Sequence, residues 1–217
     1  MTRAATGIYR GATAEERRAQ RRRRLMDAAL ELIGTQGWAQ TTLRGVCERA
    51  RVGPRFFYES FADLDELAAA VHAELVDDAL QKTLRAVREA PDDLAAKSHA
   101  GVATIIRAFT DDPRRARFVF AEAHASETLM RLRFRAMRTI ADVVAEQAAT
   151  LLDMPPDSEV VRQAFALLFT GGVAEMILVW LDGGLDLDRD GLIDLCHEFL
   201  LTSARTLPDL AARVSRR

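Results

Sequence analysis

Apolar residues recur along most of this chain at spacings of three and four, which is the pattern of amphipathic helices. No run alternates apolar and polar residues convincingly at the period of two that a half-buried strand requires. The first predicted helix covers residues 14–36 and ends at Gly37, and its inward stripe consists of Leu25, Ala28, Ala29, Leu32 and Ile33. The pattern predicts an all-α chain of about nine helices.

Two short helices with a tight turn between them follow. The first is predicted at residues 43–50, and Thr42 can cap it because its hydroxyl accepts a free backbone N–H. After a turn of three residues, Pro54 suits the first position of the second helix, which ends near Ser60. A helix this short is unstable alone in water, so a packed scaffold must hold it. Helix, short turn and helix is the arrangement of DNA-reading domains.

The rest of the chain is predicted to form a helical body. Asp63 is expected to cap a long helix that ends before Pro91. Residues 126–152 are periodic enough for a coiled coil, but three heptads that end at two prolines favour a central helix of a body. The inward stripe of this helix is predicted to contain Met130, Phe134, Met137, Ala141, Val144, Ala148 and Leu151. Further helices are expected at 93–109, 114–125, 159–181 and 188–206.

These elements divide the chain into a flexible arm, a helix-turn-helix head, a helical body and a basic tail. The predicted ranges are 1–13, 14–62, 63–207 and 208–217. Charge follows the division: residues 1–61 hold 12 basic and 6 acidic residues, a balance of +6, whereas the other 18 basic and 26 acidic residues give -8. A basic head on an acidic body favours nucleic-acid binding by the head alone.

The most apolar stretch is residues 165–181, where 13 of 17 residues are apolar. A membrane span needs at least about 17 residues, and Thr170, Glu175 and two glycines interrupt this run, so a helix of a soluble body is the favoured interpretation. A helix that is apolar on nearly all sides must be covered on both sides. We expect one side to face the protein's own core and the other side to face a second copy of the chain.

Cysteine usage and the N-terminus bear on the compartment. Cys47 and Cys196 lie on apolar faces of different predicted helices, which favours buried free thiols in a reducing cytosol over a redox switch. The N-terminus shows no apolar segment of a secretory signal. Both observations predict a cytoplasmic protein that does not enter a membrane.

A specific set of residues lies at fixed spacing between about positions 20 and 67: an Arg-rich helix start, Ala28-Ala29, Gly37, Thr41-Thr42, Val46, Val52-Gly53, Phe57-Tyr58, Phe61 and Leu67. With this set the segment resembles the DNA-binding head of the TetR family of transcriptional regulators. The rest of the chain resembles the family in size and helical character only. Arg51 departs from the family's pattern, which usually has Gly in the turn, and Leu64 stands where a phosphate-touching Lys usually follows the cap. The resemblance implies a bacterial homodimer that acts as a repressor, with an activator as the alternative.

The second short helix carries the candidate base reader. The Arg55 guanidinium can pair bidentately with a guanine edge. Phe56 is expected to face the groove, with a core position as the alternative, and Tyr58 is expected to offer its hydroxyl to phosphate. The complete predicted DNA-binding set is Thr42, Arg44, Gly53, Pro54, Arg55, Phe56 and Tyr58. The arginines between positions 17 and 24 are either a solvated face or further phosphate contacts.

One head buries too little surface to be specific, so two heads are expected on a near-palindromic operator. The predicted homodimer forms through the helices at 159–181 and 188–206. The body is expected to hold a small apolar ligand, which tilts the helix beginning at Leu64 and so releases the DNA. Candidate ligand contacts, each of which is alternatively a simple core residue, are Phe109, Phe120, His124, Phe134, Met137, Phe169, Glu175, Met176 and Trp180. Glu175 stands out because a charge inside an apolar helix must meet an arginine, close the dimer or bind a ligand.

Two other functions are alternatives to a ligand-responsive DNA-binding regulator, and the first is an enzyme. The histidines His72, His99, His124 and His197 are scattered, and the sequence shows no paired-His metal motif, Cys cluster, Gly-rich phosphate loop or nucleophile elbow. The sequence therefore predicts neither catalysis nor a cofactor. The second rival is a dimeric DNA-binding protein without a ligand, which a filled body core would favour.

Overall fold

Thr13 is the first residue that the structure, a computed structural model, describes, and the description extends to residue 214. The Thr13 hydroxyl accepts a hydrogen bond from the Glu16 backbone N–H at 3.1 Å, and the Glu16 carboxylate accepts one from the Thr13 N–H at 2.6 Å. This reciprocal capping box fixes the start of α1 (Ala14–Gln36). The rest of the predicted arm, residues 1–12, lies outside the described residues.

Between residues 13 and 214 the chain forms nine α-helices and no strand, which confirms the predicted all-α class. After α1, one 3₁₀ turn at Trp38–Gln40 leads into the two short helices. The further α-helices are α2 (Leu43–Ala50), α3 (Pro54–Tyr58), α4 (Leu64–Glu89), α5 (Leu94–Thr110), α6 (Pro113–Ala116), α7 (Glu127–Leu151), α8 (Glu159–Leu181) and α9 (Arg189–Val214). Most of them begin and end within two residues of their predicted ranges.

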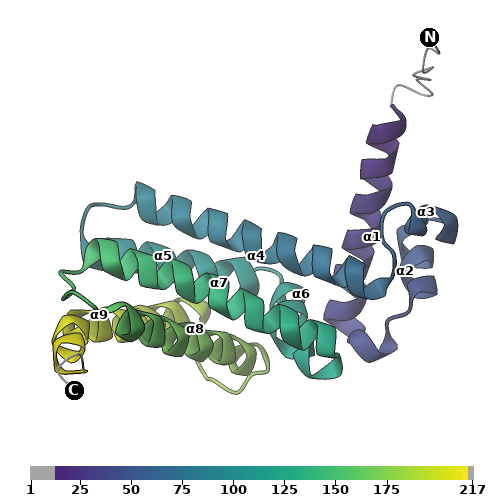
Figure 1. Ribbon diagram of the computed structural model, residues 1–217. Coiled ribbons are helices and arrows are strands. Elements are labelled where there is room, and N and C mark those ends of the chain that lie inside the picture. The colour runs from purple at the N-terminus through teal and green to yellow at the C-terminus, as the bar shows by residue number, and fades with distance from the viewer. Residues whose placement is uncertain (1–12, 215–217) are drawn as a thin grey trace, which may run out of the picture.

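Helices α1, α2 and α3 form the head at one end of the molecule (Figure 1). They share a core in which Leu25, Val46 and Phe57 have no exposed surface. Gly37 ends α1 with φ 85°, a conformation that only glycine adopts without strain, and a Cβ there would also lie 3.2 Å from the Glu122 carboxylate.

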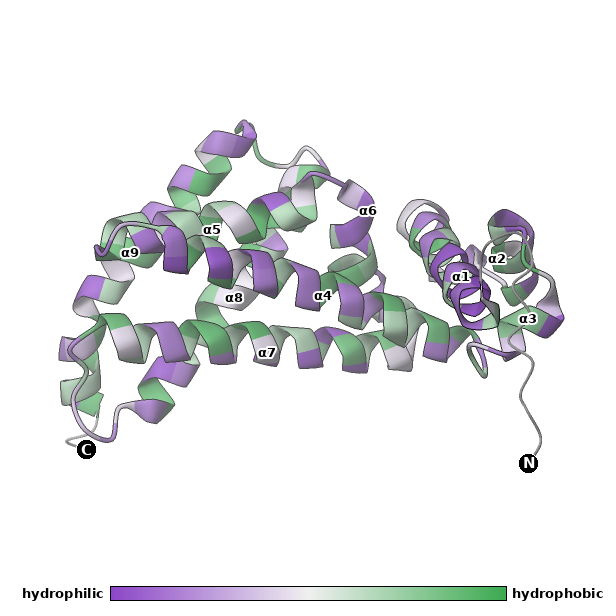
Figure 2. Ribbon diagram, turned by 90° about the horizontal axis from the view of Figure 1, so that it is seen from above, coloured by the Kyte–Doolittle hydropathy of each residue, from purple (hydrophilic) through white to green (hydrophobic). Residues whose placement is uncertain are grey.

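Helix α4 leaves the head and runs along the body, where it packs against α5 and α7 (Figure 1). Helix α8 packs on α7, and α9 packs on α5 and α8. Figure 2 shows hydrophobic and hydrophilic residues interleaved along α4 and α7, as expected of helices with one buried face. Most buried apolar residues of the head and the body belong to one continuous cluster, so packed side chains join the head to the body.

The segment 113–125 consists of three different helical turns, whereas a single helix was expected over residues 114–125. Helix α6 is followed by a π-helical turn at Arg117–Ala121 and a 3₁₀ turn at Glu122–Ala125. This segment lies among α1, α4, α7 and α8, so it is covered on several sides. That cover explains why three consecutive residues, Phe118, Val119 and Phe120, are all buried. Regular helical periodicity does not predict such a run.

The predicted inward stripe of α7 is partly wrong. Phe134 is 62% exposed, and the buried residues of this helix are Leu129, Leu132, Ala136, Ile140, Ala141, Ala145 and Ala148. The predicted stripe follows the largest apolar side chains at spacings of four and three. The buried face of α7 instead contains many alanines. Small residues there let neighbouring helices approach closely.

The last helix continues beyond its predicted end. Helix α9 passes through Pro208 and ends at Val214, so residues 208–214 are helical rather than a frayed tail. Leu207 and Ala211 lie one turn apart and are both buried, which holds this last part of the helix against the body. Residues 215–217 of the predicted tail lie outside the described residues.

Within residues 13–214, α8 alone is long and apolar enough to cross a membrane by length and composition, with a mean hydropathy of 2.0 over its most apolar window. In the fold its Phe169, Val173 and Ile177 face the core. Its other face leaves Leu167 and Leu168 exposed, so the helix is covered on one side only by this chain.

Candidate nucleic-acid interface and ligand cavity

The turn between α2 and α3 is closed by backbone hydrogen bonds. The Thr42 hydroxyl accepts from the Gly45 N–H at 3.0 Å and caps α2 as predicted. Arg51 adopts the left-handed conformation, φ 52° and ψ 46°, and the N–H of Val52 bonds the Cys47 carbonyl at 3.0 Å. The left-handed arginine costs roughly 1 kcal/mol, which the buried Val52 and the closed turn offset. Arg51 thus takes the usual turn geometry without a glycine.

Helix α3 has one anchored side and one open side. Phe57 and Phe61 are buried, with ring centroids 5.9 Å apart. Phe56 is 40% exposed and Tyr58 is 61% exposed. Arg55 is exposed as well and makes no hydrogen bond or ion pair with another residue of the described chain. The open side of α3 therefore presents a cation between two accessible aromatic rings.

Two arginines of α1 reach this open side. The Arg21 guanidinium lies over the Phe56 ring at 4.5 Å from its centroid and pairs with Glu59 at 3.2 Å. Arg18 donates to the Glu59 backbone carbonyl. Sequence reasoning treated the α1 arginines as a solvated face or as phosphate contacts and missed the stacking. The signal was present, since an exposed aromatic ring beside an Arg-rich helix favours a cation–π contact.

Arg44 and Thr42 lie on α2 and at its start, next to this surface. The Arg44 side chain is 88% exposed and pairs with Glu48 one turn later at 2.8 Å. The hydrogen bond from Arg44 to Glu48 raises the pKa of the guanidinium, so its charge is permanent. Solvent screens an ion pair this exposed, so Arg44 can exchange Glu48 for a phosphate at little cost.

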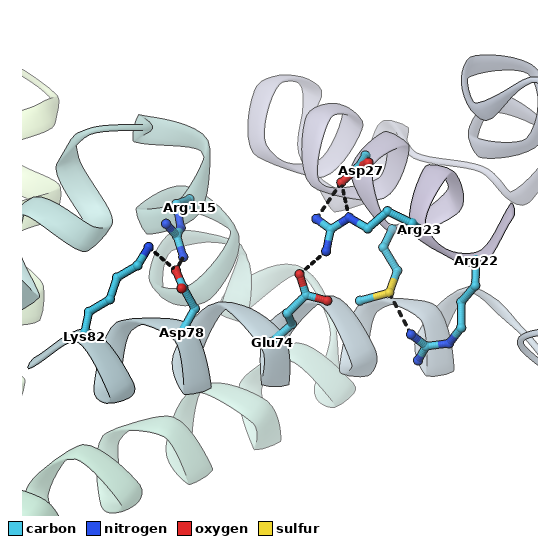
Figure 3. Close-up of polar contacts among 8 residues, drawn as sticks. Arg22, Arg23, Asp27, Glu74, Asp78, Lys82 and Arg115 are labelled. Atoms are coloured by element: carbon cyan, nitrogen blue, oxygen red, sulfur yellow. Dashed lines mark hydrogen bonds and ion pairs between the residues drawn. The ribbon is translucent and has the colours of Figure 1, made fainter. Parts of the chain in front are cut away.

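Ion pairs join the head to the body along α4 (Figure 3). Arg23 of α1 binds Asp27 of its own helix and Glu74 of α4. One turn further on, Asp78 of α4 accepts from Lys82 at 2.9 Å and from Arg115 of α6. Partial burial raises the pKa of Asp78, but the hydrogen bonds from Arg115 and Lys82 outweigh burial and hold that pKa below its ordinary value.

The segment 113–125 is also fixed to the head at both of its ends. Gly34 of α1 lies so close to Arg114 that a Cβ on the glycine would be 2.6 Å from the Arg114 Cβ. At the other end, the Glu122 carboxylate accepts from the Trp38 backbone N–H at 2.8 Å. The two contacts therefore fix this segment to the last turns of α1 and to the start of the connection between α1 and α2.

The body encloses a cavity of about 140 Å³ between α4, α5, α7, α8 and α9. Its walls are almost entirely apolar, and Lys97 is the one charged residue among the described residues that line it. Phe109 and Phe120 line the cavity with ring centroids 4.8 Å apart. Phe120 belongs to the π-helical turn, so the wall of the cavity and the segment fixed to the head are parts of the same element.

The structure brings four of the nine predicted ligand contacts to this cavity, namely Phe109, Phe120, Met137 and Phe169. Five do not line it, namely His124, Phe134, Glu175, Met176 and Trp180. Glu175 instead pairs with Arg133 of α7, the first of the three expected alternatives, but its side chain is 59% exposed, so the expectation of a buried charge is wrong. Sequence reasoning missed Lys97 and Thr170, although Thr170 is a polar residue inside the most apolar stretch.

Exposed apolar side chains form stripes on α8 and α9. On α8 they are Val160, Leu167, Leu168 and Val179, and on α9 they are Leu195, Phe199 and Leu210. Their spacing places each set on one face of its helix, and the two helices pack side by side. A Cβ added to Gly171 or Gly172 on α8 would meet no atom within 4 Å. The combined surface, here called the α8–α9 face, is an open apolar patch of the kind that marks a protein interface.

The arrangement of the head defines the class of the protein: it is a helix-turn-helix protein with an appended all-helical body. Residues 25–71 match the family model described as bacterial regulatory proteins, tetR family. The head thus matches the TetR family model over these residues, which confirms the resemblance found in the sequence. No curated protein matches the sequence.

Solved structures share the complete fold. The fatty acid degradation regulator FadR from Bacillus halodurans matches with a TM-score of 0.70 and 18% identity over 83% of this chain and 94% of that chain. FadR from Bacillus subtilis, solved in complex with stearoyl-CoA, matches with a TM-score of 0.63 and 14% identity over 86% and 97%. A TetR family transcription regulator from Marinobacter aquaeolei VT8 matches with a TM-score of 0.60 and 17% identity over 87% and 97%. The head and the body together therefore have the fold of TetR-family regulators.

Proposed function

We propose that this protein is a cytoplasmic transcriptional repressor that binds a near-palindromic DNA operator as a homodimer and is released by a small apolar ligand. One observation carries the proposal. Helix α3 is anchored through Phe57 on one side, and on the other side it presents Arg55, Phe56 and Tyr58 to solvent. Exposed aromatic and cationic side chains on a rigid short helix are the groups that read base edges and hold phosphates. The domain division that we propose is the one expected from the sequence, with the end of α9 added to the body.

Each residue of the open side has a role in this proposal. Arg55 reads a guanine, because it has no partner among the described residues that would compete for its guanidinium. Phe56 contacts a thymine methyl, and the Arg21 guanidinium stacked on its ring sets its orientation. The Tyr58 hydroxyl binds a phosphate. These assignments make α3 the recognition helix.

The groups around α3 position the head without reading sequence. Thr42 and Arg44 are exposed near the start of α2, where they can reach the DNA backbone. Gly53 and Pro54 are exposed at the start of α3, and the missing side chain of Gly53 lets the chain approach a phosphate closely. Phosphate contacts of this kind fix register and give salt-dependent affinity.

The α8–α9 face supplies the dimer. It contains several exposed leucines and a phenylalanine, together with a glycine surface on α8 that lets a partner helix approach closely. Two helices from each of two copies would form a four-helix interface around a two-fold axis. The axis then relates two heads, and successive major-groove faces of one operator accept them.

The cavity favours a ligand-regulated protein over the ligand-independent alternative. An apolar ligand that displaces Phe120 also moves the π-helical turn that carries it. That turn leads directly to Glu122, which holds the Trp38 N–H in the head. Ligand binding thereby favours a second arrangement of head and body, in which α4 is tilted and the spacing of the two heads no longer fits the operator. The FadR structure with stearoyl-CoA supports the proposal that a body of this fold takes an apolar ligand.

A gel-shift assay with the DNA that flanks the protein's own gene tests the proposal. We expect a discrete complex with one inverted repeat and release of the DNA by an apolar effector found in a small-molecule screen. A complex that no effector releases would support the ligand-independent alternative. Specific binding together with activation of a reporter gene would show that the protein is an activator rather than a repressor.

A further inference from the structure

The cavity is elongated and parallel to the helices of the body. Its lining extends from Leu94 to Phe109 on α5 and from Met137 to Leu152 on α7. Fifteen residues of α-helix span about 22 Å, so the lining residues follow a path of that length along the body. The N-terminal end of α5 and the C-terminal end of α7 both lie at the end of the body remote from the head (Figure 1). A slender, extended molecule fits this shape better than a rounded one.

The end remote from the head is the polar end. Lys97 lies near the start of α5, and its side chain is 15% exposed, so most of its methylene stem is buried and a small part of the side chain reaches solvent. The Lys97 ammonium group pairs with Asp92 at 3.5 Å, and the Asp92 side chain is 98% exposed. A pair with so exposed a carboxylate is weak, so the Lys97 charge remains open to an anion at the mouth. Gln147 of α7 lines the same end of the cavity.

One polar group inside the cavity lacks a partner. The Thr170 side chain is 94% buried on α8, lines the cavity, and its Oγ1 makes no hydrogen bond with the described residues. A buried hydroxyl without a partner costs roughly 1–3 kcal/mol, which a ligand oxygen at this point would recover. The opposite end, toward the head, is closed by the aromatic rings of Phe109 and Phe120.

We propose that the cavity takes a long-chain acyl ligand with an anionic head group. The inference rests on the proposed function, since it names the class of the effector. The head group meets Lys97 at the mouth, an oxygen of the ligand meets Thr170, and the apolar chain runs toward Phe109 and Phe120. Only a chain long enough to reach Phe120 moves the π-helical turn and the Glu122 contact with the head. Short chains therefore bind weakly and do not release DNA.

Titration calorimetry of the full chain without DNA tests the binding site. The probes are stearate, stearoyl-CoA, octanoate and the uncharged octadecanol. We expect one stearoyl chain per protomer, with octanoate and octadecanol each bound at least tenfold more weakly. Tighter binding of stearoyl-CoA than of stearate would identify the thioester as the preferred form of the ligand, and the reverse order would identify the free acid. No saturable binding of either stearoyl compound would overturn the inference.

Matched variants test the assignment of single residues. Lys97→Met should lower the affinity for the anionic probes about tenfold, because a charge-assisted contact is lost. The affinity for octadecanol should stay unchanged, because the buried part of the side chain is kept. Lys82→Met, which changes the other lysine of the chain and lies outside the cavity, should leave all affinities unchanged. Thr170→Val should weaken the acyl probe that carries its oxygen inside the cavity. Equal affinities for charged and uncharged probes, or no effect of Lys97→Met, would refute the anionic head group.

A third variant tests the direction of the chain. Ala174 lines the cavity on α8, near Ile177 and the head-side end. Ala174→Leu fills part of that end, so the tightest-binding chain should become shorter by a few carbons, with folding checked by thermal unfolding. An unchanged chain-length optimum in a folded variant would contradict the proposed direction. Binding of stearate by a protein that binds no operator would support the site and refute the proposed function, so the two can fail separately.

Discussion

The Glu122 carboxylate accepts a hydrogen bond from the backbone N–H of Trp38 at 2.8 Å, across 84 residues of sequence. Trp38 belongs to the turn between α1 and α2, and Glu122 follows the π-helical turn whose Phe120 lines the cavity. A carboxylate bonded to a backbone N–H is directional, so this contact fixes the distance between the cavity wall and the helix-turn-helix head. In the proposed mechanism it is the contact through which the body acts on the head.

Glu122→Leu should separate ligand binding from DNA release. Loss of the bond to the Trp38 N–H should cost about 1 kcal/mol of stability and leave the affinity for the acyl probe intact. Release of operator DNA at saturating probe should then be incomplete, which fluorescence anisotropy of a labelled operator measures. Glu127→Leu, at an exposed position near the start of α7, is the control. Complete release with the Glu122 variant would show that the coupling passes elsewhere, for example through the Arg115–Asp78 pair.

Changing Arg55 or Arg44 to alanine should weaken DNA binding in two different ways. Arg55→Ala should cost about 1–3 kcal/mol on the operator and relax the preference at one base pair, because a base contact is lost. Arg44→Ala should weaken binding to every sequence and lower the salt slope by about one unit, because a phosphate contact is lost. Titrations of operator and random duplexes at several salt concentrations distinguish the two. Equal losses on both duplexes for Arg55→Ala would reject its role as a base reader.

The sequence predicted the head better than it predicted the body. The head follows from local rules: Thr42 caps α2, Pro54 starts α3, and the alternating burial of Phe56 and Phe57 follows from a helix with one packed side. The cavity depends on which helices pack together, and local periodicity does not contain that information. Aromatic residues were therefore chosen as ligand contacts, and Trp180 was among them, although its indole N–H bonds the Leu187 carbonyl at 2.7 Å.

The π-helical turn could not be predicted for a related reason. Three consecutive buried residues arise there because neighbouring helices cover the segment on several sides, which is a tertiary effect. Phe134 shows the opposite error, since a large apolar side chain placed at the right spacing is nevertheless exposed. Large apolar side chains at helical spacing identify the buried face of a helix only where the helix buries a single face.

Leu168→Glu should convert the proposed dimer to a monomer. Leu168 is 79% exposed in the single chain, so the charge does not disturb the fold of one protomer, but it would be buried without a partner in the α8–α9 face. Light scattering coupled to gel filtration measures the mass, and circular dichroism confirms that the helices remain. Gln81→Glu on α4 introduces the same charge on an exposed part of another helix and should leave the dimer intact. A Leu168→Glu protein that stays dimeric would place the interface elsewhere.

His72 should make the protein less stable in mild acid. Burial lowers the pKa of this histidine from 6.5 to about 4, against a smaller opposite effect of the Val119 backbone. As the pH falls, His72 is protonated in the unfolded chain before it is protonated in the folded protein. The contribution of the neutral imidazole to the free energy of unfolding is therefore fully present above pH 6.5 and is lost as the pH falls toward 4. The loss is on the order of 3 kcal/mol at the acid end.

Urea unfolding at pH 7.5 and at pH 5, about one and a half pH units below the ordinary histidine pKa, checks this expectation. His72→Gln keeps a polar side chain that does not titrate, so its free energy of unfolding should change less between the two pH values. The exposed His124, changed in the same way, serves as the comparison. Identical pH dependence of all three proteins would show that His72 does not titrate differently on unfolding.

The most direct test of the proposed DNA reading is a comparison of two duplexes by fluorescence anisotropy at one fixed salt concentration. One duplex carries the inverted repeat found upstream of the protein's own gene, and the other carries the same bases with both half-sites scrambled. The account predicts one dimer on the inverted repeat, with an affinity at least about 1,000-fold higher than on the scrambled duplex. Equal affinity for both duplexes, or a complex that contains a single protomer, would contradict it.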